Sequence, residues 1–382
     1  MRAFIKYSKP SCVSGRALRT ALEIDGGIHF PKDVSKYDTL IRWGSSGDSY
    51  MDEEFQRVIN TAKNVVQSAN RQHMFQRLAR HIPGGQLLWH SRVPYSHDNS
   101  TLTMLRHRFG RYGKDIELLG RSDERWDEIR ANYETNGMFS VQFWPADYEV
   151  RVHIVDGNSV SMQVKARRNA DGTPTHELIE ANKLTIRNDA NGWGLWPLSN
   201  SLAALLGIHK PSIREQAKQV IRLFNLQFGV VDFLVRTPAG KYNNLQHETK
   251  ILEINTAPGV DGQTLERYIS SIRTLLAKPI QATQEGAVAN PFDASVVDDP
   301  EDDYPEDDGH WCDDPQCSEC GPIEQPIRAT TETGRVAGTM TRAMLNDIYR
   351  TPFQGSSPRP IRTVQSEIQW ADMTNWMTRR RG

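Results

Sequence analysis

Two acids and one amide stand at spacings that suit a metal site. Glu253 and Asn255 are two positions apart in the apolar run 251–255, so both should share one face of a strand with Ile251. Asp232 lies in an earlier run, VVDFLV, and this run would pair with the run 251–255 as an antiparallel hairpin. Mg²⁺ prefers such oxygen ligands together with phosphate oxygens. We therefore predict Asp232, Glu253 and Asn255 as metal ligands, the alternative being solvated acids on an exposed sheet face.

A glycine-containing basic loop is the second candidate. The stretch LTMLRHRFGRYGKDIELL places two glycines among four cations: Gly110, Gly113, Arg106, Arg108, Arg111 and Lys114. Glycine lets backbone amides approach a phosphate, and the cations balance its charge. The spacing is short, so a solvated basic hairpin or a nucleic-acid contact would fit the same residues.

Periodicity predicts the elements that must position these residues. Apolar residues at helical spacing follow Pro211, with Ser212 and Glu215 as a capping box; they are Ile213, Ala217, Val220, Ile221 and Phe224. A second hairpin is expected over residues 148–168, with its turn at Asp156 and Gly157. On its strands the apolar residues Val150, Val152, Ile154, Val160, Met162 and Val164 alternate with Glu149, Arg151, His153 and Lys165. The charged side chains should line one face of the sheet.

Length and composition set the domain plan. The 382 residues suggest two or more domains, with a small α/β unit over 1–62 and a denser region over 63–280. From residue 281 the chain is acidic and then Arg-rich, without Lys or Arg between Lys278 and Arg328, which predicts a largely disordered tail. The net charge of −1 makes nucleic acid an unlikely partner. No apolar run approaches a spanning helix and no signal peptide is evident, so a cytoplasmic protein that does not contact membranes is expected.

A zinc site in the tail is a weaker prediction. His310, Cys312, Cys317 and Cys320 have the number and types of ligands for one Zn²⁺. The run is short and crowded, so a flexible, reduced tail is the favoured alternative.

The order of these segments resembles the ATP-grasp superfamily, especially its glutamate-ligase, glutathione-synthetase and D-alanine:D-alanine-ligase branch. The resemblance is carried by RHRFGRYGKDIEL, VQFWPADYE, VRVHIV, FGVVDFL and LEINTAPG. It covers about residues 63–280, with a lid subdomain at about 80–142 and a C-terminal lobe at about 146–280, while residues 1–62 are similar to the small domain that precedes the grasp. The implied fold is α/β (α+β), with two lobes that grip ATP.

The resemblance also implies roles for individual residues. Asp232, Glu253 and Asn255 would hold Mg²⁺ or Mn²⁺, as two ions, against the phosphates of ATP. The implied nucleotide contacts are Arg71, Arg106, Gly110, Arg111, Gly113 and Lys114 at the phosphates, Gln142, Phe143 and Trp144 at the adenine, and Glu149 at the ribose. Arg151, Arg106 and Lys165 would face the transferred phosphoryl group as catalytic residues.

The implied activity is that of a carboxylate-amine ligase that works through an acyl phosphate and releases ADP. This chain has Arg71 and Arg106 where relatives commonly have lysines, and Gln142 where an acid is more usual. Arginine keeps the charge but brings a planar fork. The alternatives are a degenerate nucleotide-binding scaffold that recruits a partner through its tail, and an ATP-grasp kinase.

Several other residues have both a functional and a structural interpretation. Arg42 and the stretch 14–16 could face the carboxylate substrate, although a structural role is commoner for an Arg and a Gly turn. Trp193 and Trp196 could wall an acceptor site, but core packing is favoured. We expect His153 to be a neighbour of the site and Cys12 an ordinary thiol.

Overall fold

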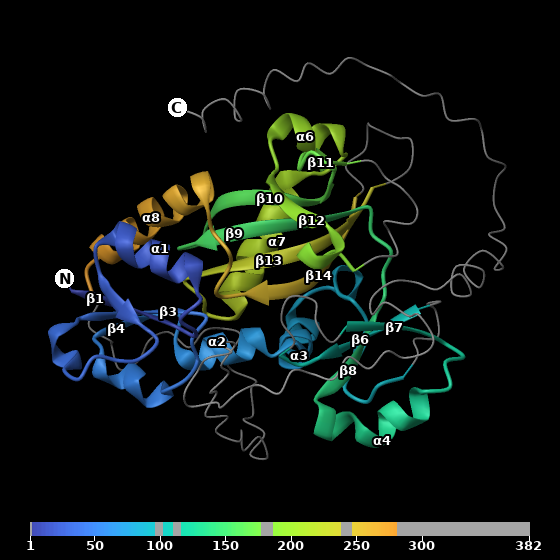
Figure 1. Cartoon of the computed structure of the whole chain (residues 1–382), viewed down its shortest axis with the longest axis horizontal. Coiled ribbons are helices and arrows are strands. Elements are labelled where there is room, and N and C mark those ends of the chain that lie inside the picture. The colour runs from blue at the N-terminus through green and yellow to red at the C-terminus, as the bar shows by residue number, and fades with distance from the viewer. Residues whose placement is uncertain (1, 96–101, 110–115, 177–185, 238–246, 281–382) are drawn as a thin grey trace. The chain divides into compact units, whose positions relative to one another are not determined.

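The computed structural model describes residues 2–95, 102–109, 116–176, 186–237 and 247–280. Three β-sheets with helices packed against them confirm the expected α/β fold (Figure 1). The predictions for Gly110, Arg111, Gly113, Lys114, the four zinc candidates and the tail from 281 lie outside the described residues. Among the helices described, none has the length and apolar character needed to cross a membrane.

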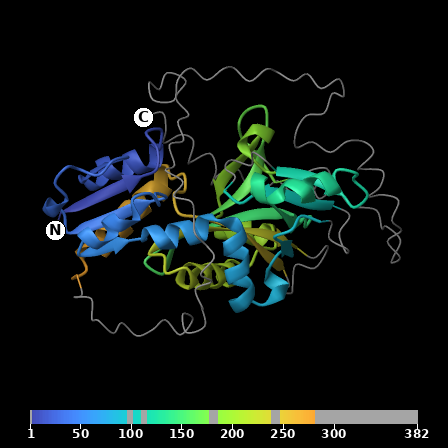
Figure 2. The same ribbon diagram turned by 90° about the horizontal axis from the view of Figure 1, so that it is seen from below.

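The N-terminal sheet is parallel and has the strand order β2-β1-β3-β4. Its strands are β1 (Ala3–Tyr7), β2 (Asp25–Gly27), β3 (Thr39–Trp43) and β4 (Arg57–Ile59). The last described helix, α8 (Gly262–Ala277), lies beside this sheet and beside α1 (Val13–Leu22) (Figures 1 and 2). Trp43 is fully buried there, stacked on Phe228 at 4.9 Å and edge-on to Tyr268 at 5.7 Å. The core of this sheet therefore includes residues from the far end of the fold.

The largest sheet is antiparallel, with the order β11-β10-β9-β13-β14 and β12 paired to β10. Its strands are β9 (Tyr148–Val155), β10 (Asn158–Arg168), β11 (Pro174–Thr175), β12 (Trp193–Pro197), β13 (Phe228–Arg236) and β14 (Glu248–Asn255). Strands β9 and β10 form one predicted hairpin, and β13 and β14 form the other. Both hairpin predictions are confirmed.

Two bulges break the alternation that the sequence suggests. Asp232 pairs with Glu253, but the next pair is Phe233 with Ile251, which leaves Leu252 as an extra residue. Ile251 therefore packs in the same core as Ile254, and the prediction that it shares the face of Glu253 was wrong. A second bulge at Val160 packs that residue near α8 and separates it from the core of Met162 and Val164.

Helix α7 (Lys210–Leu223) covers the apolar face of this sheet, and short α6 (Asn200–Leu205) precedes it. The predicted stripe of α7 is buried as expected: Ile213, Ala217, Val220, Ile221 and Phe224. The predicted capping box was wrong, because the helix begins at Lys210 after His209, which makes no side-chain cap. Pro211 occupies the first turn, where its missing N–H is tolerated. Ser212 is therefore inside the helix.

The third sheet is antiparallel, with the order β5-β8-β6-β7. Its strands are β5 (His90–Ser91), β6 (Leu102–His107), β7 (Ile116–Gly120) and β8 (Met138–Gln142), with α4 (Trp126–Asn136) before β8. Helices α2 (Ala62–Ala69) and α3 (Arg71–His81) connect the N-terminal sheet to it along the chain. Four 3-10 turns complete the described elements: η1 (Val34–Lys36), η2 (Ser49–Glu54), η3 (Gly84–Gln86) and η4 (Asp189–Asn191).

Candidate active site

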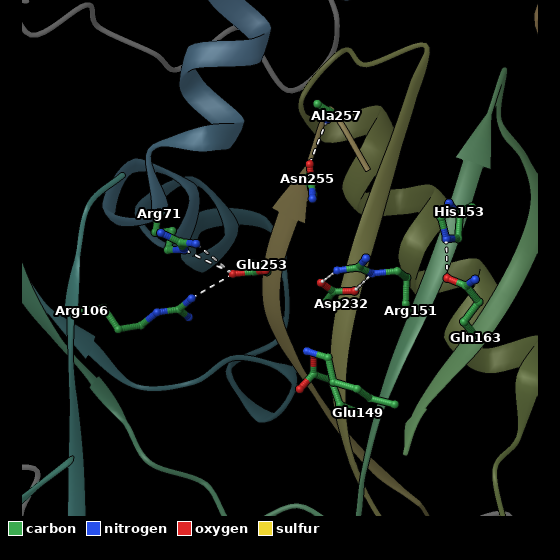
Figure 3. Close-up of polar contacts among 11 residues, drawn as sticks. Arg71, Arg106, Glu149, Arg151, His153, Gln163, Asp232, Glu253, Asn255 and Ala257 are labelled. Atoms are coloured by element: carbon green, nitrogen blue, oxygen red, sulfur yellow. Dashed lines mark hydrogen bonds and ion pairs between the residues drawn. The ribbon is translucent and has the colours of Figure 1, made fainter. Parts of the chain in front are cut away.

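A row of polar side chains crosses the face of the large sheet opposite α7 (Figure 3). Strand β9 contributes Glu149, Arg151 and His153; β10 contributes Gln163 and Lys165; β13 contributes Asp232; and β14 contributes Glu253 and Asn255. Asp232 stands directly opposite Arg151 on one side and Glu253 on the other. The sheet therefore brings together the three predicted metal ligands and two of the three predicted catalytic residues.

Arg151 and Asp232 form a bidentate ion pair. The guanidinium donates from Nε to Oδ1 and from Nη2 to Oδ2, each at 2.7 Å. The Asp232 side chain is 1% exposed and that of Arg151 is 12% exposed. Although burial works to lower it, Asp232 raises the pKa of Arg151 above its usual value. This pair fixes the orientation of both groups.

Two arginines from other elements converge on Glu253. Arg106 at the end of β6 donates from Nη2 to Oε2 at 2.9 Å, and Arg71 of α3 donates to the same oxygen from Nη2 at 3.2 Å and Nε at 3.3 Å (Figure 3). Oε1 of Glu253 has no partner within the described residues. Arg71 is placed by the start of α3, where Asn70 accepts hydrogen bonds from the backbone N–H groups of Gln72 and His73.

Arg106 has donors that no described residue uses. It is 3% exposed, and its Nε and Nη1 are buried without a hydrogen-bond partner in the part of the chain that the structure describes. Burial lowers the pKa of Arg106 to about 10, and neighbouring Arg71 adds to this effect. Burial alone would raise the pKa of Glu253, but Arg71 and Arg106 hold it well below its usual range. Unsatisfied buried guanidinium donors are costly, and a bound anion would satisfy them.

Lys165 and Glu149 pair across β10 and β9. Their side chains are 17% and 7% exposed, so this pair is also largely enclosed. On this face Arg71, Arg106, Arg151 and Lys165 oppose Glu149, Asp232 and Glu253, which leaves one net positive charge. An anionic ligand suits that balance.

The segment that follows the implied adenine contacts after β8 is held by two arginines that the sequence did not single out. Arg236 donates to the carbonyl of Pro145 from Nε at 3.1 Å and Nη2 at 2.7 Å, and its guanidinium lies 4.4 Å from the Trp144 ring centroid. Arg187 donates to the carbonyls of Ala146 and Asp147. Ahead of this segment, Gln142 and Phe143 are partly exposed, whereas Trp144 is buried.

The loop after β14 lies against the N-terminal sheet. Asn255 Oδ1 accepts the backbone N–H of Ala257 at 2.9 Å, so this predicted ligand also stabilises the turn before Pro258. Gly44, which follows β3, has φ +65°, and a Cβ there would lie 2.4 Å from that of Ala257. Only glycine fits this close approach.

His153 is buried and uncharged. Its Nε2 contacts Gln163 Oε1 at 2.9 Å (Figure 3). Its Nδ1 contacts the Tyr268 hydroxyl at 3.1 Å. Burial lowers the pKa of His153 to about 4. The expectation that His153 neighbours the site agrees with its position two residues from Arg151.

The donor set is compatible with Mg²⁺ if phosphate oxygens complete the coordination. Among the described residues, no group of three or more His, Cys, Asp or Glu side chains could hold a metal. Counting contacts from the described residues, Glu253 Oε1 accepts none and each Asp232 oxygen accepts one hydrogen bond, which leaves lone pairs available. Mg²⁺ commonly uses one or two carboxylates together with substrate phosphates and water.

The structure assigns several other candidates to packing. Arg42 is fully buried and donates to Asp52 at 2.5 Å and to the carbonyls of Gly47 and Asp48, so its possible role toward a substrate is replaced by a structural one. Trp193 is 8% exposed under the Arg187 guanidinium, as the packing alternative predicts. Gln163 and Tyr268 were missed; for Gln163 the available signal was its position two residues before Lys165.

No protein-family model and no curated protein matches this chain. It is similar to solved structures, among them D-alanine–D-alanine ligase from Bacillus anthracis, with 9% identity, 72% of this chain and 93% of that chain covered, and a TM-score of 0.48. Macrocyclase MdnC from Microcystis aeruginosa MRC, bound with precursor peptide MdnA, has 12% identity, coverage of 73% and 100%, and a TM-score of 0.46. A RimK domain ATP-grasp protein from Sphaerobacter thermophilus DSM 20745 has 11% identity, coverage of 72% and 98%, and a TM-score of 0.45.

All three likenesses have TM-scores below 0.5, so they do not place this chain in a family. Identities and scores at this level do not identify an activity.

Proposed function

We propose that this protein is an ATP- and Mg²⁺-dependent carboxylate-amine ligase. The observation that supports it best is the convergence of Arg71 and Arg106 on one Glu253 oxygen, with buried Arg106 donors left over. A phosphate group would satisfy those donors, and a metal ion would take the place of the guanidinium groups on Glu253. The sequence motifs supply the reaction class. The proposal also keeps residues 1–62 as the preceding domain and 63–280 as the ATP-grasp domain.

In this proposal the site residues have two roles, to position the reacting groups and to neutralise the charge of the phosphates. A carboxylate oxygen of the acid would attack the γ-phosphorus, so that ADP leaves and an acyl phosphate forms. An amine nitrogen would then attack the acyl carbon, expelling phosphate and losing a proton to give the amide. Mg²⁺, when bound by Asp232, Glu253 and Asn255, would neutralise charge on the phosphates. Arg106, Arg151 and Lys165 would hold the transferred phosphoryl group in line.

The other end of the nucleotide would lie along the segment after β8. We assign the base to the segment Gln142, Phe143 and Trp144, and the ribose hydroxyls to Glu149. Glu149 is paired with Lys165, so a ribose would meet a carboxylate that is already oriented. The acid could be a small molecule or a peptide.

A nucleotide-binding protein without group transfer is the second candidate. It is favoured by one observation: guanidinium groups already engage both predicted metal-binding carboxylates. If these pairs persist when nucleotide binds, the two carboxylates offer a metal only Glu253 Oε1 and the remaining lone pairs of Asp232. A kinase, the third possibility, would form ADP without requiring an amine.

Calorimetric titration with ATP, with and without Mg²⁺, tests the proposal. We expect Mg²⁺ to strengthen ATP binding to the wild-type chain and Glu253→Gln to lose that gain. Glu248→Gln on the same strand is the matched control, because Glu248 is exposed and its carboxylate lies 3.9 Å from the Arg236 guanidinium. The control should behave as wild type.

Wild-type protein that is folded but binds no ATP under either condition would rule out the ligase. ATP binding that ignores Mg²⁺ would favour the protein without group transfer. If binding is metal-dependent, ADP release in the presence of acids and amines then separates a ligase from a kinase.

A further inference from the structure

Gln163 is the least explained polar side chain of the site. It lies on β10 directly opposite Arg151 of β9, and it is 7% exposed. Its Oε1 contacts His153, whereas its Nε2 has no hydrogen-bond partner among the residues described. That nitrogen is not fully enclosed, so it is accessible to solvent or to a ligand. A donor group is therefore available beside Arg151.

The contact with His153 fixes which way this amide points. Among the described residues the buried Tyr268 hydroxyl has only His153 Nδ1 as an acceptor, so in a neutral ring Nε2 carries the hydrogen and donates it to Gln163 Oε1. The imidazole is neutral because burial lowers its pKa to about 4, and its Nδ1 is then a bare acceptor for the Tyr268 hydroxyl at 3.1 Å. Burial raises the pKa of Tyr268, so the hydroxyl keeps its proton. Donation runs in one direction, from Tyr268 through His153 to Gln163.

This network is anchored far from the site. Tyr268 is fully buried on α8, edge-on to the His153 ring at 5.6 Å and to Trp43 of β3 at 5.7 Å. Rotating the Gln163 amide would place an N–H against the His153 N–H, and a clash of two buried donors is costly. The NH₂ group is thereby held toward the polar row.

We propose that Gln163 is a further residue of the phosphoryl-transfer site, donating from Nε2 to an oxygen of the transferred phosphoryl group, and that His153 and Tyr268 are the positioning residues that orient it. The inference rests on the proposed function. It fits the charge balance, because Arg151 is already paired with Asp232 and a neutral donor adds a directed contact without another charge. Preorganised donors of this kind stabilise charge that develops during transfer.

The test compares two ligands that differ only at the transferred group. Mg²⁺–ADP binds without that group, while Mg²⁺–ADP with fluoroaluminate supplies a planar mimic of it. Gln163→Met keeps the length of the side chain and removes its donor, so it should weaken the fluoroaluminate complex by about tenfold or more. Binding of Mg²⁺–ADP alone should stay unchanged. Gln216→Met is the matched control, since Gln216 is a hydrogen-bonded glutamine on the opposite face, beside Thr249.

The positioning role has its own readout. Tyr268→Phe removes the first donor of the network and keeps the ring, so it should weaken the fluoroaluminate complex in the same direction. In the Gln163→Met background it should have no additional effect, because the group being oriented is gone. A residue that only supports packing would weaken both ligands, and by the same factor in either background.

The outcomes separate this inference from the proposed function. If the wild type binds neither Mg²⁺–ADP nor Mg²⁺–ATP, the proposed function fails first. The proposed role of Gln163 is overturned if the wild type binds Mg²⁺–ADP but fluoroaluminate does not tighten this binding. It is also overturned if Gln163→Met binds the fluoroaluminate complex as tightly as the wild type does. Equal loss for both ligands also overturns it, and Gln163→Glu, which keeps a hydrogen-bonding oxygen but repels the anion, provides a second variant should Gln163→Met not fold.

Discussion

Arg151 and Asp232 face each other on adjacent strands and share two parallel hydrogen bonds of 2.7 Å. Arg151→Met should lower the free energy of unfolding by about 3–5 kcal/mol, because it leaves a buried carboxylate without its partner. The double variant Arg151→Met/Asp232→Leu should recover much of that loss, since the uncompensated charge is gone. Urea unfolding of the two single variants and the double variant measures this. Single-variant losses that simply add would contradict it.

Glu253 should compete with anions for its two arginines. In Glu253→Gln the amide is a weaker acceptor, so Arg71 and Arg106 become available, and pyrophosphate should bind more tightly in the absence of metal. Isothermal titration of the wild type and the variant in a chelating buffer provides the comparison. Arg106→Met in the Glu253→Gln background should remove the gain. Weaker pyrophosphate binding in Glu253→Gln would show that the three groups do not form an anion site.

His153 should make the fold sensitive to mild acid. Burial lowers its pKa to about 4, whereas an unfolded histidine titrates at about 6.5. Between these values the unfolded state binds the additional proton, so the stability that neutral His153 contributes is present above about pH 6.5 and is lost as the pH falls toward 4. The loss should be on the order of 3 kcal/mol. Urea unfolding at pH 7 and pH 4.5 should show a smaller difference in His153→Gln than in the wild type.

Gly44 should not tolerate a side chain. Its φ of +65° alone costs an alanine about 1–2 kcal/mol, and the new Cβ would also overlap that of Ala257. Gly157→Ala is the control, because Gly157 has φ +73° and open space around it, so it incurs only the backbone cost. Ala257→Gly should rescue part of the Gly44→Ala loss in thermal unfolding. Equal losses for the two alanine variants would argue against the overlap.

Arg42 should stabilise the fold without contributing to nucleotide binding. It is fully buried, and Arg42→Met removes the donor to Asp52 Oδ1 and to three loop carbonyls, so the melting temperature should fall clearly. Arg19→Met should change the melting temperature little, because Arg19 is exposed and donates to one carbonyl, that of Gly26 in the same N-terminal sheet. Folded Arg42→Met protein should bind Mg²⁺–ATP as the wild type does. Selective loss of binding at unchanged stability would restore the functional interpretation.

The sequence predicts the site best where the chemistry is local. Alternation along β9, β13 and β14 correctly places Arg151, Asp232 and Glu253 on one face, because side-chain direction follows from the strand itself. The bulge at Leu252 is not predictable in this way, since it depends on how β14 pairs with β13. The start of α7 also differs from the prediction. The helix already begins at Lys210 and Pro211, before Ser212, which is the residue that capping propensity favours as the N-cap.

Contacts between distant residues lie beyond local pattern. Arg71 and Glu253 are 182 residues apart, and only the family resemblance suggested that they share a site. His153 and Tyr268 are 115 residues apart, and no motif links them. The structural role of Arg42 is likewise not predictable from local pattern, because it depends on the loop that folds around this side chain. Tertiary packing, rather than propensity, decides such cases.

Arg57 on β4 has a further consequence for how the fold comes apart. Its guanidinium donates to the carbonyls of Leu275, Leu276 and Lys278, which close the end of α8. One side chain near the beginning of the chain thus donates hydrogen bonds to the free carbonyl groups at the end of the last helix that the structure describes. Neither the N-terminal strands nor α8 can unravel without exposing the partners of the other, so hydrogen exchange should show them opening together as one cooperative unit.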